Sequence, residues 1–91
     1  MRKSELIAAV AEKTDMSKGQ AGFILNTILE EMTTALSNND TISLVGFGSF
    51  AQRHRGARIG KNPQTGEVLA IQASNTVAFK PGKQLKEAVS E

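Results

Sequence analysis

The strongest candidates for ligand-binding residues in the sequence form a basic run that contains no acidic residue: Arg53, Arg55, Arg58 and Lys61. Guanidinium groups make forked contacts to phosphate, so such a run favours a polyanionic partner. Strand alternation places Arg53 and Arg55 on one face and leaves Arg58 out of phase by one residue. A bulge at Gly56-Ala57 would restore the phase, because glycine is a common bulge residue. The cations would then form a stripe along one side of an extended strand.

A hairpin tip follows this run at residues 62–66, where the sequence reads Asn-Pro-Gln-Thr-Gly. Pro63 presets the turn, and Gly66 can take the positive φ angle that closes it. We therefore expect residues 53–61 and 67–74 to pair as a two-stranded arm, about 30 Å long at about 3.3 Å per residue. Such a ribbon fits a groove of DNA. Pro63 is then either a plain turn former or an apolar wedge of the kind that DNA-bending proteins insert between base steps.

The same sequence gives little indication of a catalytic site or a metal site. There is no Cys, and the single histidine, His54, lies beside arginines. A metal site usually needs three or four ligands, so we interpret His54 as a surface histidine. No paired carboxylates and no nucleophile with a base can be recognised, which disfavours an enzyme. We expect no catalytic residue, no metal, no cofactor and no small-molecule substrate.

Helices and strands must position the basic residues, and the apolar pattern indicates both. Ser17 and Gln20 have the spacing of a capping box at the start of the second helix. Beyond Asp40 the apolar period changes from that of a helix to that of a strand. The chain is therefore expected to be α+β. The predicted elements are helices at residues 3–13, 18–37 and about 83–90, and strands at residues 42–44, 49–55 and 77–79.

The size of the chain calls for a partner chain. A protein of 91 residues buries only about 60–65% of the surface of its unfolded form, so it needs additional stabilisation. Disulfides are excluded by the lack of Cys. The wide apolar stripe of the second helix, with Phe47, Phe50 and Phe79, supplies surface for a dimer core. These rings could instead stack on bases, but their strand phases favour the core.

The two parts of the chain differ in charge and in expected role. Residues 1–40 carry four cations and six anions, and residues 41–91 carry seven cations and three anions. The first part could be a DNA-reading helix–turn–helix, but its second helix is apolar with Glu30 and Glu31 outside, which favours dimerisation. The second part favours a polyanion partner, with a solvated surface as the alternative.

No apolar run approaches 18 residues and no secretion signal is recognisable, so we expect a cytoplasmic protein without a membrane partner.

A long motif resembles the HU/integration-host-factor family of histone-like DNA-binding proteins. It reads Gly46-Phe47-Gly48-Ser49-Phe50, then Arg55, Arg58, Gly60-Lys61-Asn62-Pro63 and Thr65-Gly66. The resemblance covers the whole length and implies a single domain over residues 1–91. It implies an intertwined dimer with a helical base, a short antiparallel sheet, an arm at about residues 53–76 in each subunit and a short C-terminal helix. The dimer would be a homodimer or a heterodimer with a paralogue.

The same resemblance implies how the dimer would act on double-stranded DNA. The arms would follow the minor groove with Pro63 as a wedge, so that the protein bends and compacts chromosomal DNA in the nucleoid. A sequence-selective regulator of the integration-host-factor type is the alternative. Contacts from Arg to phosphate carry no sequence information, which favours the first function. The implied DNA-binding residues are Arg53, Arg55, Arg58, Lys61, Asn62 and Pro63 on the arm, Lys80, Lys83 and Lys86 between the arms, and Lys3 on the flank.

One stretch departs from the family pattern. Family members often carry Lys or Arg on the returning strand of the arm, whereas residues 68–73 here read Val-Leu-Ala-Ile-Gln-Ala. This departure removes the returning strand from the implied phosphate contacts.

Overall fold

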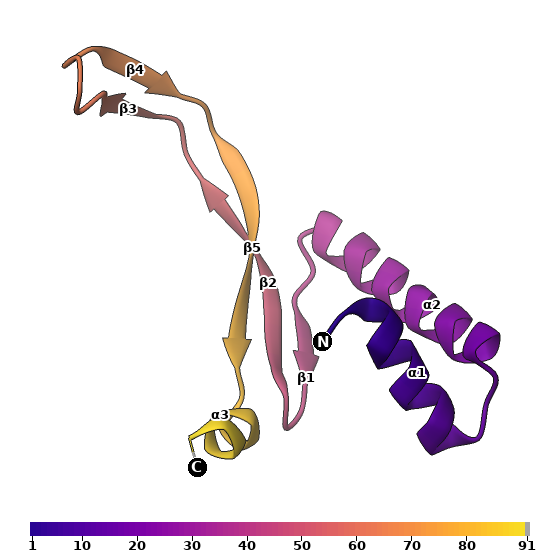
Figure 1. Cartoon of the computed structure of the whole chain (residues 1–91). Helices are drawn as coiled ribbons and strands as arrows, with labels where there is room; N and C mark the ends of the chain where they lie inside the picture. Colours follow the sequence, from indigo (N-terminus) through magenta and orange to yellow (C-terminus); the bar gives the residue numbers. More distant parts are fainter. Residues whose placement is uncertain (91) are drawn as a thin grey trace. The chain divides into compact units, whose positions relative to one another are not determined.

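The computed structural model describes residues 1–90 and has the α+β architecture expected from the sequence. Two helices precede five strands and a last short helix (Figure 1). The elements are α1 (Lys3–Thr14), α2 (Lys18–Ser37), β1 (Ile42–Leu44), β2 (Gly48–Arg55), β3 (Arg58–Lys61), β4 (Val68–Ile71), β5 (Ser74–Pro81) and α3 (Lys83–Val89). The described residues divide into two compact units, residues 1–34 and residues 35–90. Within residues 1–90, no helix has the length and apolar character needed to cross a membrane.

The connection between α1 and α2 confirms the predicted capping box. Asp15 ends α1 in the left-handed conformation, with φ 56°. The Ser17 hydroxyl then accepts a hydrogen bond from the Gln20 backbone N–H at 3.1 Å, and the Ser17 N–H donates to the Gln20 side-chain oxygen at 3.3 Å. These two bonds satisfy backbone donors that a helix start leaves without partners. The helix therefore begins where the sequence predicts.

The helical unit buries very little by itself. Ala11 and Ala21 are the only buried apolar residues among residues 1–90. Along α2, Phe23 is 73% exposed and Ile28 is 49% exposed. Large apolar side chains at this exposure gain only part of the stabilisation of about 1.5–3 kcal/mol that full burial of each would give. The exposed stripe supports the expectation that a second chain completes the core.

We expect the melting temperature to rise by about 5–10 °C when the protein concentration is raised a hundredfold. Unfolding a dimer separates two chains, and a hundredfold change in concentration alters its stability by about 2.7 kcal/mol. The measurement is a series of thermal melts by circular dichroism, with sedimentation equilibrium as the control for mass. A melt that does not depend on concentration, together with a monomer mass, would contradict the dimer.

The second unit is built on a three-stranded antiparallel sheet in the order β1-β2-β5. Ile42, Phe50 and Phe79 lie opposite one another in a row across the three strands. The ring centroids of Phe50 and Phe79 are 4.6 Å apart, and those of Phe47 and Phe79 are 5.6 Å apart. This row therefore marks the apolar face of the sheet, as the phases of the three phenylalanines predict.

Strand β5 is longer than the sequence indicates. The apolar pattern predicts a strand only over residues 77–79, whereas β5 runs from Ser74 to Pro81 and pairs with β2 along its whole length. The added residues are mostly polar, so they give no apolar alternation. They are held in the strand by the ladder to β2. Residues 53–55 and 74–76, expected in the arm, thus extend the central sheet, and a separate two-stranded sheet of β3 and β4 lies beyond them.

Close backbone contacts hold α3 against the turn between β1 and β2. The Gly82 N–H donates to the Phe47 carbonyl at 2.7 Å, and a Cβ at Gly82 would lie 3.2 Å from that same backbone. At Gly48 a Cβ would lie 2.6 Å from the Lys80 carbonyl oxygen. A side chain at Gly48 would therefore force β2 and β5 apart at the end nearest α3.

Candidate nucleic-acid interface

One face of the central sheet carries basic residues among small ones. Directly opposite residues of antiparallel strands point to the same side, and Arg53 lies opposite Thr76 while Arg55 lies opposite Ser74. Lys80 lies on this face too, opposite Ser49. The other residues of the face are Ser43, Ala51 and Ala78. Short side chains between exposed cations leave a surface that a polyanion can approach closely.

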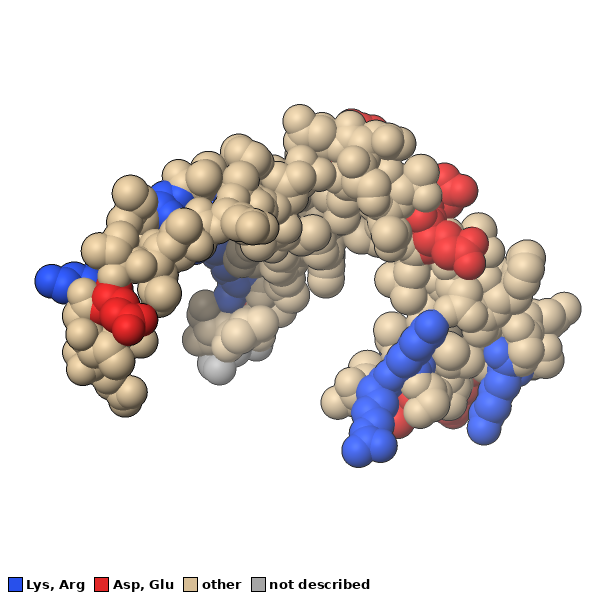
Figure 2. All heavy atoms as spheres, turned by 90° about the horizontal axis from the view of Figure 1, so that it is seen from above, with Lys and Arg blue, Asp and Glu red and all other residues tan. Residues whose placement is uncertain are grey.

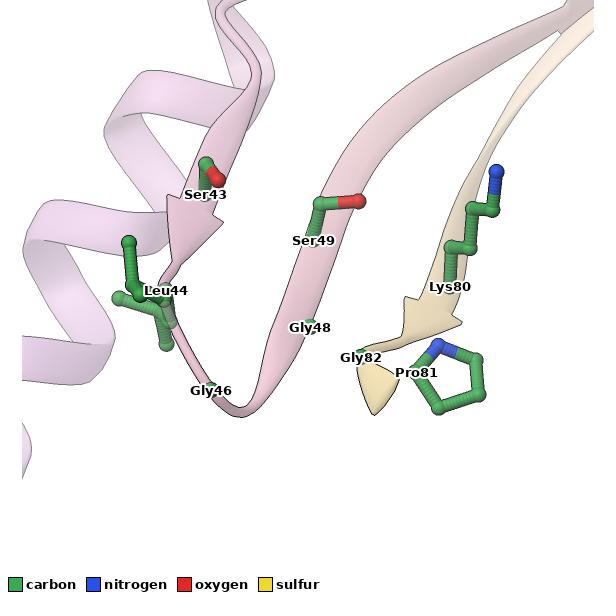
Figure 3. Close-up of a pocket in the computed structure, with 9 residues that line it drawn as sticks. Ser43, Leu44, Gly46, Gly48, Ser49, Lys80, Pro81 and Gly82 are labelled. Carbon is green, nitrogen blue, oxygen red and sulfur yellow. The ribbon is translucent and has the colours of Figure 1, made fainter. Parts of the chain in front are cut away.

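The end of this face near α3 forms a hollow of about 340 Å³ (Figure 3). Ser43, Ser49 and Lys80 form one row across its three strands. Gly46, Gly48 and Gly82 also line it and add no side chain. The row therefore presents two hydroxyl groups and one ammonium group, all of which can donate hydrogen bonds to a phosphate oxygen.

His54 lies on the opposite face of the same sheet. Its Nδ1 atom is 2.7 Å from the Asn75 side-chain oxygen, directly across the β2–β5 ladder. Gln52 shares this face, and its side-chain amide donates to the Leu36 carbonyl at 3.1 Å, which ties β2 to the end of α2. Within residues 1–90, no group of three or more His, Cys, Asp or Glu side chains is placed to hold a metal ion. These contacts give His54 a local partner and leave the basic face uncovered.

Beyond the central sheet, β3 and β4 form a distal ribbon that runs in a different direction (Figure 1). The expected bulge at Gly56-Ala57 is wrong. Arg55 pairs with Ser74 and Arg58 pairs with Ile71, so the same number of residues separates the two ladders on both strands. A bulge would add one residue to a single strand. The ladder is instead interrupted symmetrically, at residues 56–57 and 72–73.

The expected stripe of four cations along one side of the arm is also wrong, because the strands are interrupted without a bulge. Arg58 and Lys61 are three residues apart on β3, so strand alternation places them on opposite faces of the distal ribbon. Arg53 and Arg55 share a face of the central sheet, as predicted. The basic residues of the arm therefore form a pair on the sheet and one cation on each face of the ribbon.

The tip is closed by Asn62. Its backbone N–H donates to the Glu67 carbonyl at 2.8 Å, and its carbonyl accepts from the Gly66 N–H at 2.8 Å. Its side-chain oxygen also accepts from the Gln64 N–H, at 2.9 Å. Gly66 has φ 75°, as the predicted turn requires, and Pro63 is exposed. Asn62 thus holds the loop that presents the proline ring.

Replacing Asn62 with Ala should increase the amide exchange rate of Gln64 about fivefold. The substitution removes the acceptor of a hydrogen bond whose net contribution is about 1 kcal/mol. The measurement is amide exchange by NMR, with the Gly66 amide as an internal control because its acceptor is the backbone carbonyl of residue 62. Asn62→Asp keeps a side-chain acceptor and should restore the slow rate. Equal exchange at Gln64 in all three proteins would show that the side chain does not hold the tip.

Comparison with known proteins shows which family this chain is similar to. The family described as "Bacterial DNA-binding protein" matches residues 1–90. The chain is 63% identical over 90 residues to DNA-binding protein HU-alpha of Pseudomonas aeruginosa, covering 99% of this chain and 100% of that protein. The chain belongs to the HU family of bacterial DNA-binding proteins. It is also 51% identical to DNA-binding protein HU 1 of Bacillus subtilis, covering 99% of this chain and 98% of that protein.

The fold of this chain is similar to the folds of HU proteins in solved structures. The chain superposes on a protein chain of an Anabaena HU–DNA cocrystal structure with a TM-score of 0.89 and 47% identity, covering 99% of this chain and 98% of that chain. HU from Thermotoga maritima gives a TM-score of 0.69 and 37% identity, with 98% of each chain covered.

The remaining basic residues of this HU chain lie away from the arm. Lys83 and Lys86 are exposed on α3, where Lys83 Nζ lies 4.0 Å from Glu87 Oε1. An exposed pair of this kind contributes little to stability, so the charge of Lys83 remains available to a ligand. Lys3 is exposed at the start of α1, in the helical unit. Figure 2 shows that several Lys and Arg side chains project from the surface.

Sequence reasoning missed four hydroxyl residues of the basic face: Ser43, Ser49, Ser74 and Thr76. For Ser43 and Ser49 the signal is the strand alternation of β1 and β2, whereas Ser74 and Thr76 could have been found only from the pairing of β5 with β2. This chain therefore presents more hydrogen-bond donors on this face than its charges alone indicate.

Proposed function

We propose that this HU chain binds double-stranded DNA with little sequence preference, bends it and packages chromosomal DNA in the nucleoid. One observation carries the proposal. The basic face of the central sheet, with its small residues, continues into a ribbon that ends in an exposed proline. The fold similarity to a protein in an HU–DNA cocrystal supports the same function.

The active species is a dimer, either a homodimer or a heterodimer with a paralogue. The exposed apolar residues of α2 supply the contact surface between the chains. A dimer carries two arms, so it can hold a duplex at two places and bend the segment between them. Wrapping of this kind is how architectural proteins offset the cost of deforming DNA.

The proposed roles of the residues follow from their positions. Arg53, Arg55, Arg58 and Lys61 contact phosphates beside the groove. Lys80, Lys83 and Lys86 contact the backbone between the arms, and Lys3 contacts it on the flank. Asn62 holds the tip, where Pro63 enters a base step. Phosphate contacts carry no sequence information, and the minor groove distinguishes little beyond A·T from G·C pairs.

The proposed role is architectural rather than enzymatic, and the proposed location is the cytoplasm. The chain acts as a DNA-associated component of the nucleoid. A sequence-selective regulator of the integration-host-factor type is not favoured, because the relatives that match nearly the whole chain carry HU names.

A gel-shift experiment tests the proposed function. Unrelated linear duplexes of equal length should bind within about tenfold of one another, since a specific protein prefers its own site by about a thousandfold or more. Nicked duplex and four-way junction DNA should bind more tightly than the intact linear duplex, because they bend at lower cost. A preference of a thousandfold for one linear sequence would favour the regulator, and no binding to any DNA would refute the proposal.

A further inference from the structure

One side-chain contact joins the central sheet to the end of α2. The Gln52 side-chain amide on β2 donates to the Leu36 carbonyl at 3.1 Å, and the bond is partly buried. Leu36 lies in the last turn of α2 and belongs to the same compact unit as β2. The contact therefore connects the strand that carries Arg53 and Arg55 to the helix that carries the exposed apolar stripe.

The end of α2 does not need this bond for its own hydrogen bonding. The Leu36 carbonyl already accepts from the Asn39 N–H at 3.1 Å, and the Ala35 carbonyl accepts from the Asp40 N–H at 2.9 Å. Asn39 has the left-handed conformation that commonly ends a helix, with φ 59°. Because the backbone that follows the helix satisfies these carbonyls, the effect of the Gln52 amide falls on the strand.

Gln52 marks the point at which β2 leaves the body of its unit. Residues 48–52 of β2 are half-buried, whereas residues 53–55 are exposed. Beyond Gln52, His54 contacts Asn75 of β5 at 2.7 Å, so that contact joins the two strands to each other and not to the helix. Gln52 is therefore the last half-buried side chain of β2, and it is bonded to an element outside the sheet.

From these observations we infer that Gln52 is a positioning residue for DNA bending. By holding β2 to the end of α2, its amide fixes the direction in which β2 and β5 carry Arg53 and Arg55 away from the body of the unit. The inference rests on the proposed function and adds how a bent duplex is held. A bent duplex resists its deformation and tends to straighten. Strands that are held at their base oppose this straightening, whereas strands that swing at their base permit it.

Ordinary stabilisation of the fold is the competing explanation of the same bond. Under it, loss of the bond lowers the melting temperature and leaves the bend of a bound duplex unchanged. Asn39→Ala is the matched control, because alanine is strained at φ 59° while the Gln52 amide and the Leu36 carbonyl stay in place. Both this control and a Gln52 variant should lower the melting temperature, but only the Gln52 variant should reduce bending.

The first test measures the bend by end-to-end energy transfer on a doubly labelled duplex that is saturated with protein. Gln52→Met keeps an unbranched side chain and removes the donor. One hydrogen bond corresponds to about a fivefold shift toward displaced strands in each subunit, so the complex should be less bent than that of the parent. Affinity for the intact duplex should fall about fivefold or more, and affinity for a nicked duplex should change little, because it bends at lower cost.

The salt dependence of Gln52→Met separates loss of position from loss of charge. The slope of log K against log salt should stay that of the parent, since the substitution changes no charge. A Gln52→Met complex that is bent as sharply as the parent complex overturns the inference. An Asn39→Ala complex that loses as much of the bend also overturns it, because stabilisation alone would then explain the effect.

The second test uses pH to break and restore the contact within one protein. In the Gln52→Glu variant an ionised carboxylate only accepts hydrogen bonds, so it cannot donate to the Leu36 carbonyl at about pH 8. The negative end of α2 should raise the pKa of this carboxyl above its usual value of about 4.3, and below that pKa the protonated form regains a donor. Bending by the variant should therefore recover as the pH falls from about 8 to about 4.5.

The parent and Gln52→Met are measured at the same pH values, because other ionisable groups lie on the elements that meet here. They include His54 on β2, Asp40 after α2 and Glu31, which lies more than one helical turn before Leu36. All three proteins contain these groups, so the ratio of each variant to the parent isolates the substitution. Recovery in Gln52→Glu and not in Gln52→Met supports the inference, and a ratio for Gln52→Glu that does not change with pH overturns it. A parent protein that binds no DNA, or leaves the duplex straight, refutes instead the proposed function.

Discussion

Raising the salt concentration from about 50 to about 200 mM should weaken binding to a linear duplex by up to about four orders of magnitude. The two arms of a dimer supply eight cations from Arg53, Arg55, Arg58 and Lys61. If each neutralises one phosphate, the slope of log K against log salt is about −7, from about −0.9 per contact. The lysines between the arms add to this value. The effect is large because all four side chains are exposed and, among residues 1–90, none of them forms an ion pair with an acidic residue that would compete with phosphate.

Fluorescence anisotropy with a labelled duplex at several salt concentrations measures this slope. Arg58→Ala removes one contact from each arm and should flatten the slope by about two. Lys13→Ala is the matched control, because Lys13 is exposed on α1 and has no proposed DNA contact. A parent slope near zero, or equal slopes for the parent and the Arg58 variant, would refute the electrostatic part of the proposed function.

Replacing Pro63 with Ala should reduce DNA bending more than DNA binding. The proline ring makes no phosphate contact, so its loss leaves the release of counterions nearly intact. What is lost is the wedge that holds a base step unstacked, at a cost of a few kcal/mol. We expect affinity for an intact duplex to fall about 10- to 100-fold, and affinity for a nicked duplex to fall much less, because the nick has already lost part of the stacking.

End-to-end energy transfer on a doubly labelled duplex measures the bend directly. Gln64→Ala is the control at the tip, since Gln64 uses its backbone N–H, and not its side chain, in the bond to Asn62. Arg58→Ala should weaken binding to intact and nicked duplexes alike, which separates loss of charge from loss of the wedge. If the Pro63 variant bends the duplex as sharply as the parent, Pro63 is only a turn former.

The elements that the sequence predicts well are those whose signals are local. The start of α2 depends on Ser17 and Gln20, which are three residues apart and exchange hydrogen bonds. The tip depends on Pro63 and Gly66, whose backbone preferences act within a single turn. Each of these signals lies inside one short stretch of chain. The start of α2 and the turn at the tip can therefore be predicted from the sequence without knowing how the strands pair.

The features that the sequence does not predict depend on pairing between distant strands. The first half of β5 is mostly polar, and it is a strand only because residues 53–55 offer it a ladder. Whether Arg58 lies on the same face as Arg55 depends on how many residues interrupt each of the two strands. The sequence of one strand alone does not determine this. The hydroxyl groups opposite the basic residues were missed for the same reason.

The interruption at residues 56–57 and 72–73 has a thermodynamic consequence for each arm. Because both strands leave the ladder at the same place, the orientation of the ribbon beyond it is governed by the backbone angles of four residues. One of them is Gly56, where a Cβ would meet nothing within 4 Å, so glycine supplies backbone freedom there rather than relief from a clash. When DNA fixes the arm, the conformational entropy lost at these residues opposes binding. The affinity of this protein can therefore be tuned by changing the freedom of these four residues while every side chain that touches DNA stays the same.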